Sequence, residues 1–214
     1  MSLHLQKSNQ AVAFFDFDGT LTTGDTLMPF LKFLVGAPAY YTKLLGLSPT
    51  LTAYLARLVP NDIAKQILLK KYLEGYDIKE LYIQGELFCE TAIPNILRHE
   101  GMERLKWHKE QGHECILLSA SLDIYLEAFV KKLSLDGLIC SKLRTNTKNR
   151  VSGELDGENC FGHAKALKLK QWLSSRAPCT TYGYGDSTGD HPFLMLVDEG
   201  WILKRGKFVR LDKI

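Results

Sequence analysis

The sequence of 214 residues has few cysteines, and none of them belongs to a recognisable pair. The five cysteines are scattered, odd in number and free of any Cys-x-x-Cys spacing. A disulfide framework and a structural zinc site both need paired ligands, so neither is expected, and we predict a protein of the reducing cytoplasm. The first ten residues are polar and lack the apolar core of a signal peptide, so secretion is not expected either.

A strong excess of one charge is also missing. Lys and Arg total 27 and Asp and Glu total 24, which gives a formal net charge of +3. This balance is too mild to indicate nucleic acid, and no nucleic-acid partner is predicted. Basic residues do gather near the end of the chain; we interpret them as a solvated tail, with contact to an anionic membrane surface or a phosphate-rich substrate as the alternative. They are Lys204, Arg205, Lys207, Arg210 and Lys213.

Long hydrophobic runs are absent as well. The segment between Lys43 and Arg57 contains no charge and many leucines, but Gly46 and Pro49 interrupt it, and it falls short of the roughly 20 apolar residues that span a bilayer. A transmembrane helix is therefore not expected. We interpret the segment as the interior of a small helical unit; the alternative is an apolar lip that holds an acyl chain or touches the inner face of a membrane.

What the sequence does contain is an apolar strand that ends in two carboxylates. Val and Phe in the run 11–15 predict a buried parallel strand, and Asp16 and Asp18 follow it directly, before Gly19 and Thr20. Alternation along a strand puts both acids on the same side of its carboxyl end, where open α/β sheets place their sites. Two like charges that close repel each other, so they indicate bound Mg²⁺, acid–base chemistry or nucleophilic chemistry.

A second candidate site element follows the strand predicted for 113–118. Ser119, Ala120 and Ser121 come next, and apolar residues at helical spacing predict a helix over 122–133. The Ser119 hydroxyl and the backbone N–H groups of Ala120 and Ser121 would hold phosphate oxygens at this helix N-terminus, where the dipole favours negative charge. An N-cap role for Ser121 is equally compatible with the pattern.

Three charged residues, in or beside a helix and a strand predicted later in the chain, complete the set of candidate site residues. Lys165 falls in the first turn of a helix predicted from 161 to about 174, where a cation opposes the helix dipole, so its position favours another role. Asp186 and Asp190 follow a strand predicted for 180–185, and their i, i+4 spacing puts them on one face of a helical turn. A surface lysine and a capped turn are the structural alternatives.

The remaining pattern predicts an α/β protein with a Rossmann-like, mostly parallel sheet, helices on both faces, and a helical cap inserted after the first strand. Apolar residues at helical spacing, broken by prolines and glycines, fill most of 27–97. We therefore divide the chain into a core domain of residues 1–24 and 98–214 and a cap domain of residues 25–97. Segment 143–155 is predicted to be a hairpin or an extended excursion, and 194–204 another strand.

Four motifs in this order resemble those of the haloacid dehalogenase-like (HAD) phosphohydrolase superfamily, and the match spans nearly the whole chain. In that family a cap between the first and second motifs is common and selects the substrate, which agrees with the helical segment. The motifs are Asp16-Phe17-Asp18-Gly19-Thr20, Ser119, Lys165 and Gly185-Asp186-Ser187-Thr188-Gly189-Asp190.

The resemblance implies a role for each acid and for the lysine. Asp16 would be the nucleophile that forms an aspartyl-phosphate, and Lys165 would neutralise it. Asp18 would be the general acid and base, and its presence favours phosphomonoester hydrolysis, because dehalogenase relatives lack this acid and ion-pump relatives carry Thr there. Mg²⁺ would bind Asp16, the Asp18 carbonyl and Asp186, while Asp190 would orient water or Lys165.

Within the superfamily the chain is similar to the phosphoserine-phosphatase-like subclass (IB) and to phosphatidylglycerophosphate phosphatases of type C. Asp25 stands where phosphoserine phosphatases carry a substrate-binding Glu; this shorter acid argues against phosphoserine but keeps Asp25 as a candidate substrate-binding residue. The apolar cap favours a lipid phosphate such as phosphatidylglycerophosphate. The alternatives are a phosphatase or phosphotransferase for a small soluble metabolite and a catalytically silent binding module.

Overall fold

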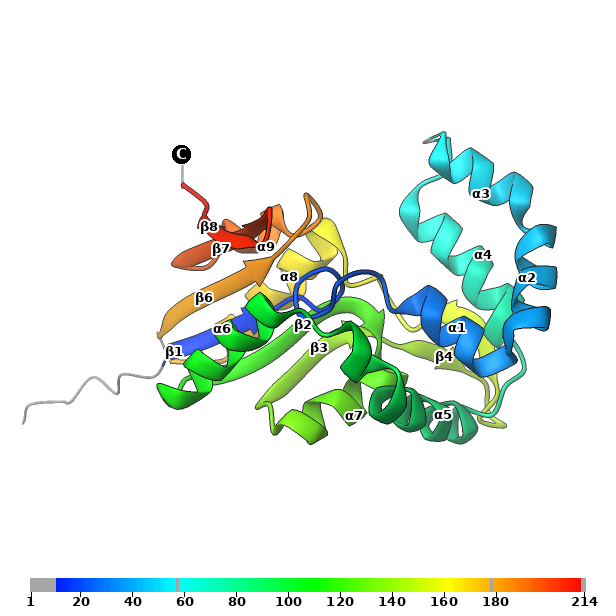
Figure 1. Ribbon diagram of the computed structural model, residues 1–214, viewed down its shortest axis with the longest axis horizontal. Helices are drawn as coiled ribbons and strands as arrows, with labels where there is room; N and C mark the ends of the chain where they lie inside the picture. The colour runs from blue at the N-terminus through cyan, green and yellow to red at the C-terminus, as the bar shows by residue number, and fades with distance from the viewer. Residues whose placement is uncertain (1–10, 57, 178, 213–214) are drawn as a thin grey trace, which may run out of the picture.

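The computed structural model describes residues 11–56, 58–177 and 179–212. At its centre lies a six-stranded sheet with the order β3-β2-β1-β6-β7-β8, in which the first five strands are parallel and β8 runs antiparallel to β7 (Figure 1). The strands are β1 Ala11–Phe15, β2 Glu114–Leu122, β3 Gly137–Ser141, β6 Thr180–Gly185, β7 Glu199–Lys204 and β8 Lys207–Arg210. This architecture confirms the predicted, mostly parallel α/β fold.

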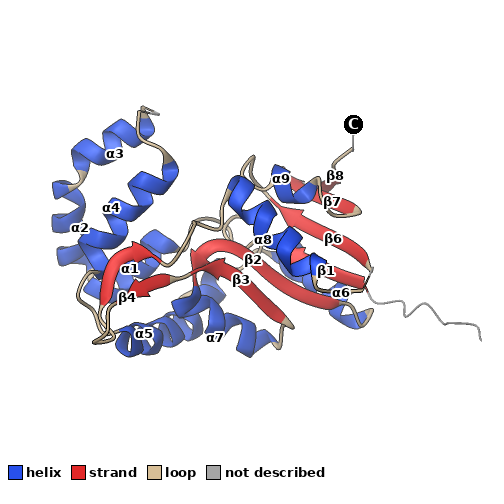
Figure 2. Ribbon diagram, turned by 180° about the vertical axis from the view of Figure 1, so that it is seen from behind, coloured by secondary structure: helices blue, strands red, loops and turns tan. Residues whose placement is uncertain are grey.

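Helices cover both faces of the sheet (Figure 2). They are α6 His99–Glu110, α7 Asp123–Leu133, α8 Gly162–Ser174 and α9 His191–Leu194. Phe15 in β1 belongs to a buried cluster shared with α6 and α7, whereas its neighbour Phe14 belongs to a second cluster shared with α8 and α9. The alternation of side chains along β1 thus supplies both cores, and every residue of this strand is buried.

Between β1 and α6 the chain is helical, as predicted. The helices are α1 Leu27–Val35, α2 Ala37–Gly46, α3 Ser48–Leu55, α4 Asn61–Leu73 and α5 Ile78–Thr91, followed by the short 3-10 helix η1 Ile93–Ile96. Helices α1 to α4 gather to one side of the sheet (blue and cyan in Figure 1), whereas α5 lies alongside α7. The buried cluster on the α7 face of the sheet continues through α5 into α1, α2 and α4, so these helices share their interior with the core.

Helices α5 and α7 approach so closely that no side chain fits at Gly85. A Cβ at this position would lie 1.9 Å from the carbonyl oxygen of Ile124 in α7. Glycine is therefore required inside α5 despite its low helix propensity. This close contact packs α5, the last long helix of the segment, against α7, which covers one face of the sheet.

The predicted hairpin is present as β4 Leu143–Thr145 and β5 Val151–Leu155, which pair antiparallel apart from the main sheet. Strand β5 packs against α4. Gly153, at φ +79°, brings the hairpin backbone against this helix, because a Cβ there would lie 2.5 Å from the Cα of Lys70. The helical segment is thus supported by α7 through α5 and by the hairpin through α4.

The C-terminal basic residues are not a tail, contrary to our interpretation. Helix α9 occupies 191–194, so the strand predicted over 194–204 begins only at Glu199, and the chain then returns as β8. Arg205 and Gly206, both at positive φ, make the turn between β7 and β8. The basic side chains of these strands are exposed, as the interpretation had them, but backbone pairing holds them in a sheet. Lys213 lies outside the described residues.

The apolar segment between Lys43 and Arg57 divides between interior and surface. Leu47 is buried, whereas Leu45 is 75% exposed, and Leu58, just after the segment, is 78% exposed. Arg57 and the side chains of Thr50, Leu51, Tyr54 and Leu55 lie outside the described residues. Across the described part of the chain, none of the helices has both the length and the apolar character needed to cross a membrane.

Candidate active site

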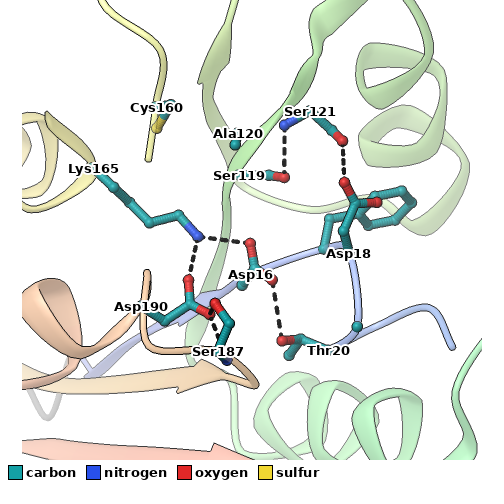
Figure 3. A network of polar contacts seen from close by, with 12 residues as sticks. Asp16, Asp18, Thr20, Ser119, Ala120, Ser121, Cys160, Lys165, Ser187 and Asp190 are labelled. Carbon is teal, nitrogen blue, oxygen red and sulfur yellow. Dashed lines mark hydrogen bonds and ion pairs between the residues drawn. The ribbon is translucent and has the colours of Figure 1, made fainter. Parts of the chain in front are cut away.

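The carboxyl end of β1 carries Asp16 into a buried position where three groups fix it. Its backbone N–H donates to the Tyr184 carbonyl (2.9 Å), its Oδ1 accepts from Lys165 Nζ (2.6 Å), and its Oδ2 accepts from Thr20 Oγ1 (3.2 Å). Figure 3 shows the two side-chain contacts. The backbone bond extends the pairing of β1 with β6, so the sheet itself sets the position of this carboxylate.

Lys165 lies in the first turn of α8 and joins two acids from distant parts of the chain. Its Nζ donates to Asp16 Oδ1 and to Asp190 Oδ1, each at 2.6 Å, and the side chain is 2% exposed. Burial lowers the pKa of Lys165, but the two carboxylates outweigh burial and the net shift is upward. The surface-lysine alternative is therefore wrong, and the two acids explain why a cation is stable at this end of a helix.

The two acids that share Lys165 differ in pKa. Burial acts to raise the pKa of Asp190, but the lysine charge and the hydrogen bonds from Ser187 outweigh burial and lower it. For Asp16, burial is the largest influence and raises the pKa in spite of the lysine. Asp190 therefore balances the charge of Lys165, and Asp16 needs further positive charge nearby to stay ionised.

Asp18 is held by a separate set of donors. Its Oδ1 accepts from the Thr26 N–H (3.1 Å) and Oγ1 (2.6 Å), and its Oδ2 accepts from Ser121 Oγ (2.5 Å). Burial, followed by the negative charge of Asp25, raises the pKa of Asp18 to about 6. A carboxyl group with this pKa can hold and release a proton near neutral pH, as a general acid or base must.

Asp186, directly after β6, completes a cluster of three acids. One carboxylate oxygen from each of Asp16, Asp186 and Asp190 lies within 4.8 Å of the others, and the Asp18 side chain is not among them. Gly19, at φ +80°, is required beside the cluster, because a Cβ there would lie 2.1 Å from Asp186 Oδ2. Crowded carboxylate oxygens are the ligands that Mg²⁺ prefers. Asp190 is the least free of the three, since its two oxygens accept four hydrogen bonds, whereas those of Asp16 accept two.

Ser119, Ala120 and Ser121 belong to β2, contrary to the predicted place at a helix N-terminus. Helix α7 begins only at Asp123, and the register of β2 with β3 shifts in this segment. Ser121 donates its N–H to Ser119 Oγ (3.0 Å) and its hydroxyl to Asp18, so it is not the N-cap of α7. The three residues nevertheless line the cavity next to Asp18.

A cavity of about 700 Å³ brings these residues together between the strand ends and the helices α1 and α4. The acidic residues and Lys165 form the wall of the cavity that lies at the strand ends. The wall formed by the helical segment is mostly apolar. Its apolar residues are Leu27, Met28, Leu47, Ala64, Ile67 and Leu68.

Asp25 lines the same cavity, but its carboxylate has a partner within its own segment. Asp25 Oδ2 accepts from the Met28 N–H (2.9 Å) in the first turn of α1. This bond satisfies one of the N–H groups left free at the start of a helix. The residue predicted to bind substrate therefore also caps α1.

Three polar residues that the patterns did not single out complete the cavity or hold its acids. Thr26 fixes Asp18, while Lys65 in α4 donates to the Ala120 carbonyl (2.6 Å) and to Oδ1 of Asn159 (2.7 Å). Thr26 precedes a helical run, so its pattern indicates a cap rather than a site residue. Lys65 and Asn159 carry no local pattern, because their contact forms only when segments far apart in the sequence meet.

Comparison with known proteins gives the family. The haloacid dehalogenase-like hydrolase family matches residues 13–195. Protein CicA of Caulobacter vibrioides is 31% identical over 194 residues, which cover 90% of this chain and 86% of CicA. A histidinol-phosphatase of Neisseria meningitidis is 28% identical over 133 residues, which cover 59% of this chain and 60% of that protein.

A solved structure supports the same assignment at the level of the fold. The structure of a phospho-aspartyl intermediate analogue of phosphoserine phosphatase matches with a TM-score of 0.64 at 17% identity, over 91% of this chain and 85% of that chain. The likeness covers the sheet and the helical segment together. With its acids and Lys165 at the strand ends and the family match from residue 13 to residue 195, the chain belongs to the haloacid dehalogenase-like hydrolases.

Proposed function

We propose that the protein is a Mg²⁺-dependent phosphomonoester hydrolase that works through an aspartyl-phosphate intermediate. The observation that carries this proposal is the 2.6 Å contact of Asp16 with Lys165, beside an Asp18 that other donors hold over the same cavity. One carboxylate is thereby suited to attack and the other to proton transfer. The family and the histidinol-phosphatase among the relatives support a phosphate ester as the substrate.

In the proposed first step, an oxygen of Asp16 attacks phosphorus, the bond from phosphorus to the leaving oxygen breaks, and Asp18 gives that oxygen its proton. In the second step, ionised Asp18 takes a proton from a water molecule whose oxygen attacks the same phosphorus. Inorganic phosphate and the free Asp16 carboxylate result. Lys165 stays protonated throughout and offsets negative charge on Asp16 and on the phosphoryl group.

Asp16, Asp186 and the carbonyl of Asp18 would hold Mg²⁺. The fit rests on the carboxylate oxygens of the acidic cluster, which lie within 4.8 Å of one another, and on the pKa values of Asp16 and Asp186, which burial raises although Lys165 acts to lower both. When bound, Mg²⁺ offsets the repulsion between the attacking carboxylate and the phosphate. Asp190 would orient Lys165, because its own oxygens are already engaged.

Ser119 and the backbone N–H of Ala120 would bind phosphoryl oxygens. Both line the cavity next to the acids. Ser121 would act by holding Ser119 and Asp18, because its N–H and its hydroxyl are given to these two residues. This division of roles refines the phosphate-binding set of Ser119, Ala120 and Ser121.

Residues 25–97 would form the cap that selects the substrate. The apolar wall of the cavity favours a phosphomonoester with a hydrophobic leaving group, such as the lipid phosphate phosphatidylglycerophosphate. The exposed Leu45 and Leu58 favour peripheral contact of a cytoplasmic protein with the inner face of the membrane. The histidinol-phosphatase relative supports the alternative, a small soluble phosphomonoester.

The test is Mg²⁺-dependent phosphate release from phosphatidylglycerophosphate in detergent, phosphoserine, histidinol phosphate and an aryl phosphate. Asp16→Asn should lose turnover by a factor on the order of 10⁴ or more with an unchanged melting temperature, because the nucleophile is gone. A preference for the lipid or for a soluble ester decides the substrate class, and added alcohol acceptors would expose phosphotransfer. Wild-type protein without release would favour a silent binding module, whereas Asp16→Asn with most of its activity would remove Asp16 from the mechanism.

A further inference from the structure

A lysine of helix α4 reaches into the catalytic cavity. Lys65 Nζ donates to the carbonyl of Ala120 at 2.6 Å and to Oδ1 of Asn159 at 2.7 Å. Ala120 lies between the two serines, so this ammonium group stands at the proposed phosphate-binding segment although its helix comes from residues 25–97. One turn earlier in α4, Asp62 accepts from Nδ2 of the same Asn159 at 2.8 Å.

The charge of Lys65 has no carboxylate in contact with it among the described residues. Among the described residues, two cationic side chains line the cavity, Lys65 and Lys165. Lys165 contacts two carboxylates at 2.6 Å, whereas the hydrogen-bond acceptors of Lys65 are a carbonyl and an amide oxygen, both neutral. Burial is the largest influence on Lys65 and lowers its pKa to about 8. A partly buried ammonium group whose hydrogen-bond partners are neutral is costly even with the carboxylates of Asp18, Asp25 and Asp62 nearby, and a bound anion would offset that cost.

We propose that Lys65 binds an anionic oxygen of the substrate and so supplies a positive charge from the cap. Lys165 offsets only part of the negative charge of the substrate, because its ammonium group already contacts Asp16 and Asp190. The anion is either the phosphoryl group in transfer or a second acidic group on the leaving group, and both offer the same oxygen chemistry. This inference rests on the proposed function and deepens it, since substrate binding would then require α4 to stay seated against Ala120.

The decisive variant is Lys65→Met, which removes the charge and keeps an unbranched side chain of similar bulk. We expect kcat/KM to fall roughly 10- to 100-fold, as for the loss of one charged hydrogen bond. Lys65→Arg should recover part of the loss because it keeps the cation. The matched control is Lys71→Met, an exposed lysine of the same helix, which should leave kcat/KM unchanged. Melting temperatures of all three variants monitor folding.

Calorimetric titration of inorganic phosphate in Mg²⁺ identifies the anion. If Lys65 contacts the phosphoryl group, the affinity for phosphate falls by a similar factor in Lys65→Met, and turnover falls equally for 4-nitrophenyl phosphate and for an ester with a second acidic group. If Lys65 contacts the leaving group, phosphate binding is unchanged and only the second ester suffers. Either result supports the proposal.

The variant Asp62→Ala tests whether Lys65 only attaches the cap to the core. It breaks the bond between Asp62 and Asn159 without removing a cation. Equal losses in Asp62→Ala and Lys65→Met would overturn the proposal. Unchanged phosphate binding together with unchanged turnover in Lys65→Met would overturn it as well. Wild-type protein without Mg²⁺-dependent turnover would instead refute the proposed function. Without turnover there is no leaving group, so weaker phosphate binding by Lys65→Met would then support a phosphate contact of Lys65, and unchanged binding would overturn the proposal.

Discussion

Lys165 Nζ lies 2.6 Å from Asp16 Oδ1, although 149 positions separate the two residues in the sequence. The same ammonium group contacts Asp190 at 2.6 Å, and all three side chains are buried. Removal of Lys165 would leave two buried carboxylates without their cation, which is strongly destabilising, whereas loss of the Asp16 charge leaves Lys165 paired with Asp190. The site therefore depends on both halves of the sheet being in place.

Asp18→Asn should affect poor leaving groups most. Alkyl phosphates need a proton on the departing oxygen, so their kcat/KM should fall by roughly 10² to 10⁴. The loss should be smaller for 4-nitrophenyl phosphate, whose phenolate leaves without a proton. The measurement is kcat/KM over a series of aryl and alkyl phosphates plotted against leaving-group pKa. A uniform loss across the series would contradict the role of Asp18 as proton donor.

Removal of divalent metal should abolish turnover and lower thermal stability. The carboxylates of Asp16, Asp186 and Asp190 repel one another, and a cation that binds the folded state alone stabilises it by mass action. Addition of Mg²⁺ to chelator-treated protein should raise the melting temperature. Asp186→Asn should remove most of that rise, whereas Glu86→Gln, at an exposed acid of α5, should retain it. A full rise in Asp186→Asn would place the metal elsewhere.

Gly85→Ala should destabilise the protein by about 1 to 3 kcal/mol or more, because the added methyl group would overlap the Ile124 carbonyl. Urea unfolding gives the free energy of unfolding. Gly46→Ala is the matched control: it adds the same methyl group at the end of α2, where a Cβ would meet no atom of the described residues within 4 Å apart from its own chain neighbours and helix backbone, and it should be neutral or slightly stabilising. Equal effects of the two changes would show that α5 and α7 separate without cost.

His108 should make stability depend on pH in the acid range. Its Nε2 contacts the Tyr184 hydroxyl and its Nδ1 the Nδ1 of His113, both at 2.8 Å. Burial, then the charges of His113 and Arg104, lower the pKa of His108 to about 3. Between this value and the unfolded value of about 6.5, the unfolded state binds the extra proton, so stability falls as pH falls, by at most about 1.4 kcal/mol per pH unit.

Urea unfolding between pH 7 and pH 4 measures this slope. His108→Gln should lessen the fall in stability below pH 6.5, while His163→Gln, at an exposed histidine, should leave the slope as in the wild type. Parallel curves for wild type and His108→Gln would contradict the lowered pKa.

The parallel sheet and its acids were predictable because they share one local feature. Asp16 and Ser119 stand directly after or within an apolar strand, Asp186 directly follows a strand of Thr, Tyr and Gly, and parallel strands end at a common edge. Strand β8 escaped prediction because backbone pairing rather than apolar alternation holds it, and three of its four side chains are exposed. Ser121 was misplaced because a bulged strand and a helix start look alike over so few residues.

Contacts between segments far apart in the chain leave no pattern in the sequence. Nothing near Lys65 in the sequence indicates the carbonyl of Ala120, and Thr26 looks like an ordinary residue before a helix although it holds Asp18. Such contacts depend on the angle at which α4 and α1 meet the strand ends. Close approaches such as Gly85 of α5 against α7 and Gly153 of the hairpin against α4 likewise show only in three dimensions.

The central place of β1 also sets an order of events during synthesis. Ala11 pairs with Thr180, so the strand that emerges first acquires its β6 neighbour only after most of the chain has been made. At typical rates of translation this delay is about ten to thirty seconds. Throughout that time five residues destined for complete burial have no partner on that side. Strand β1 therefore needs protection from aggregation until β6 has been made.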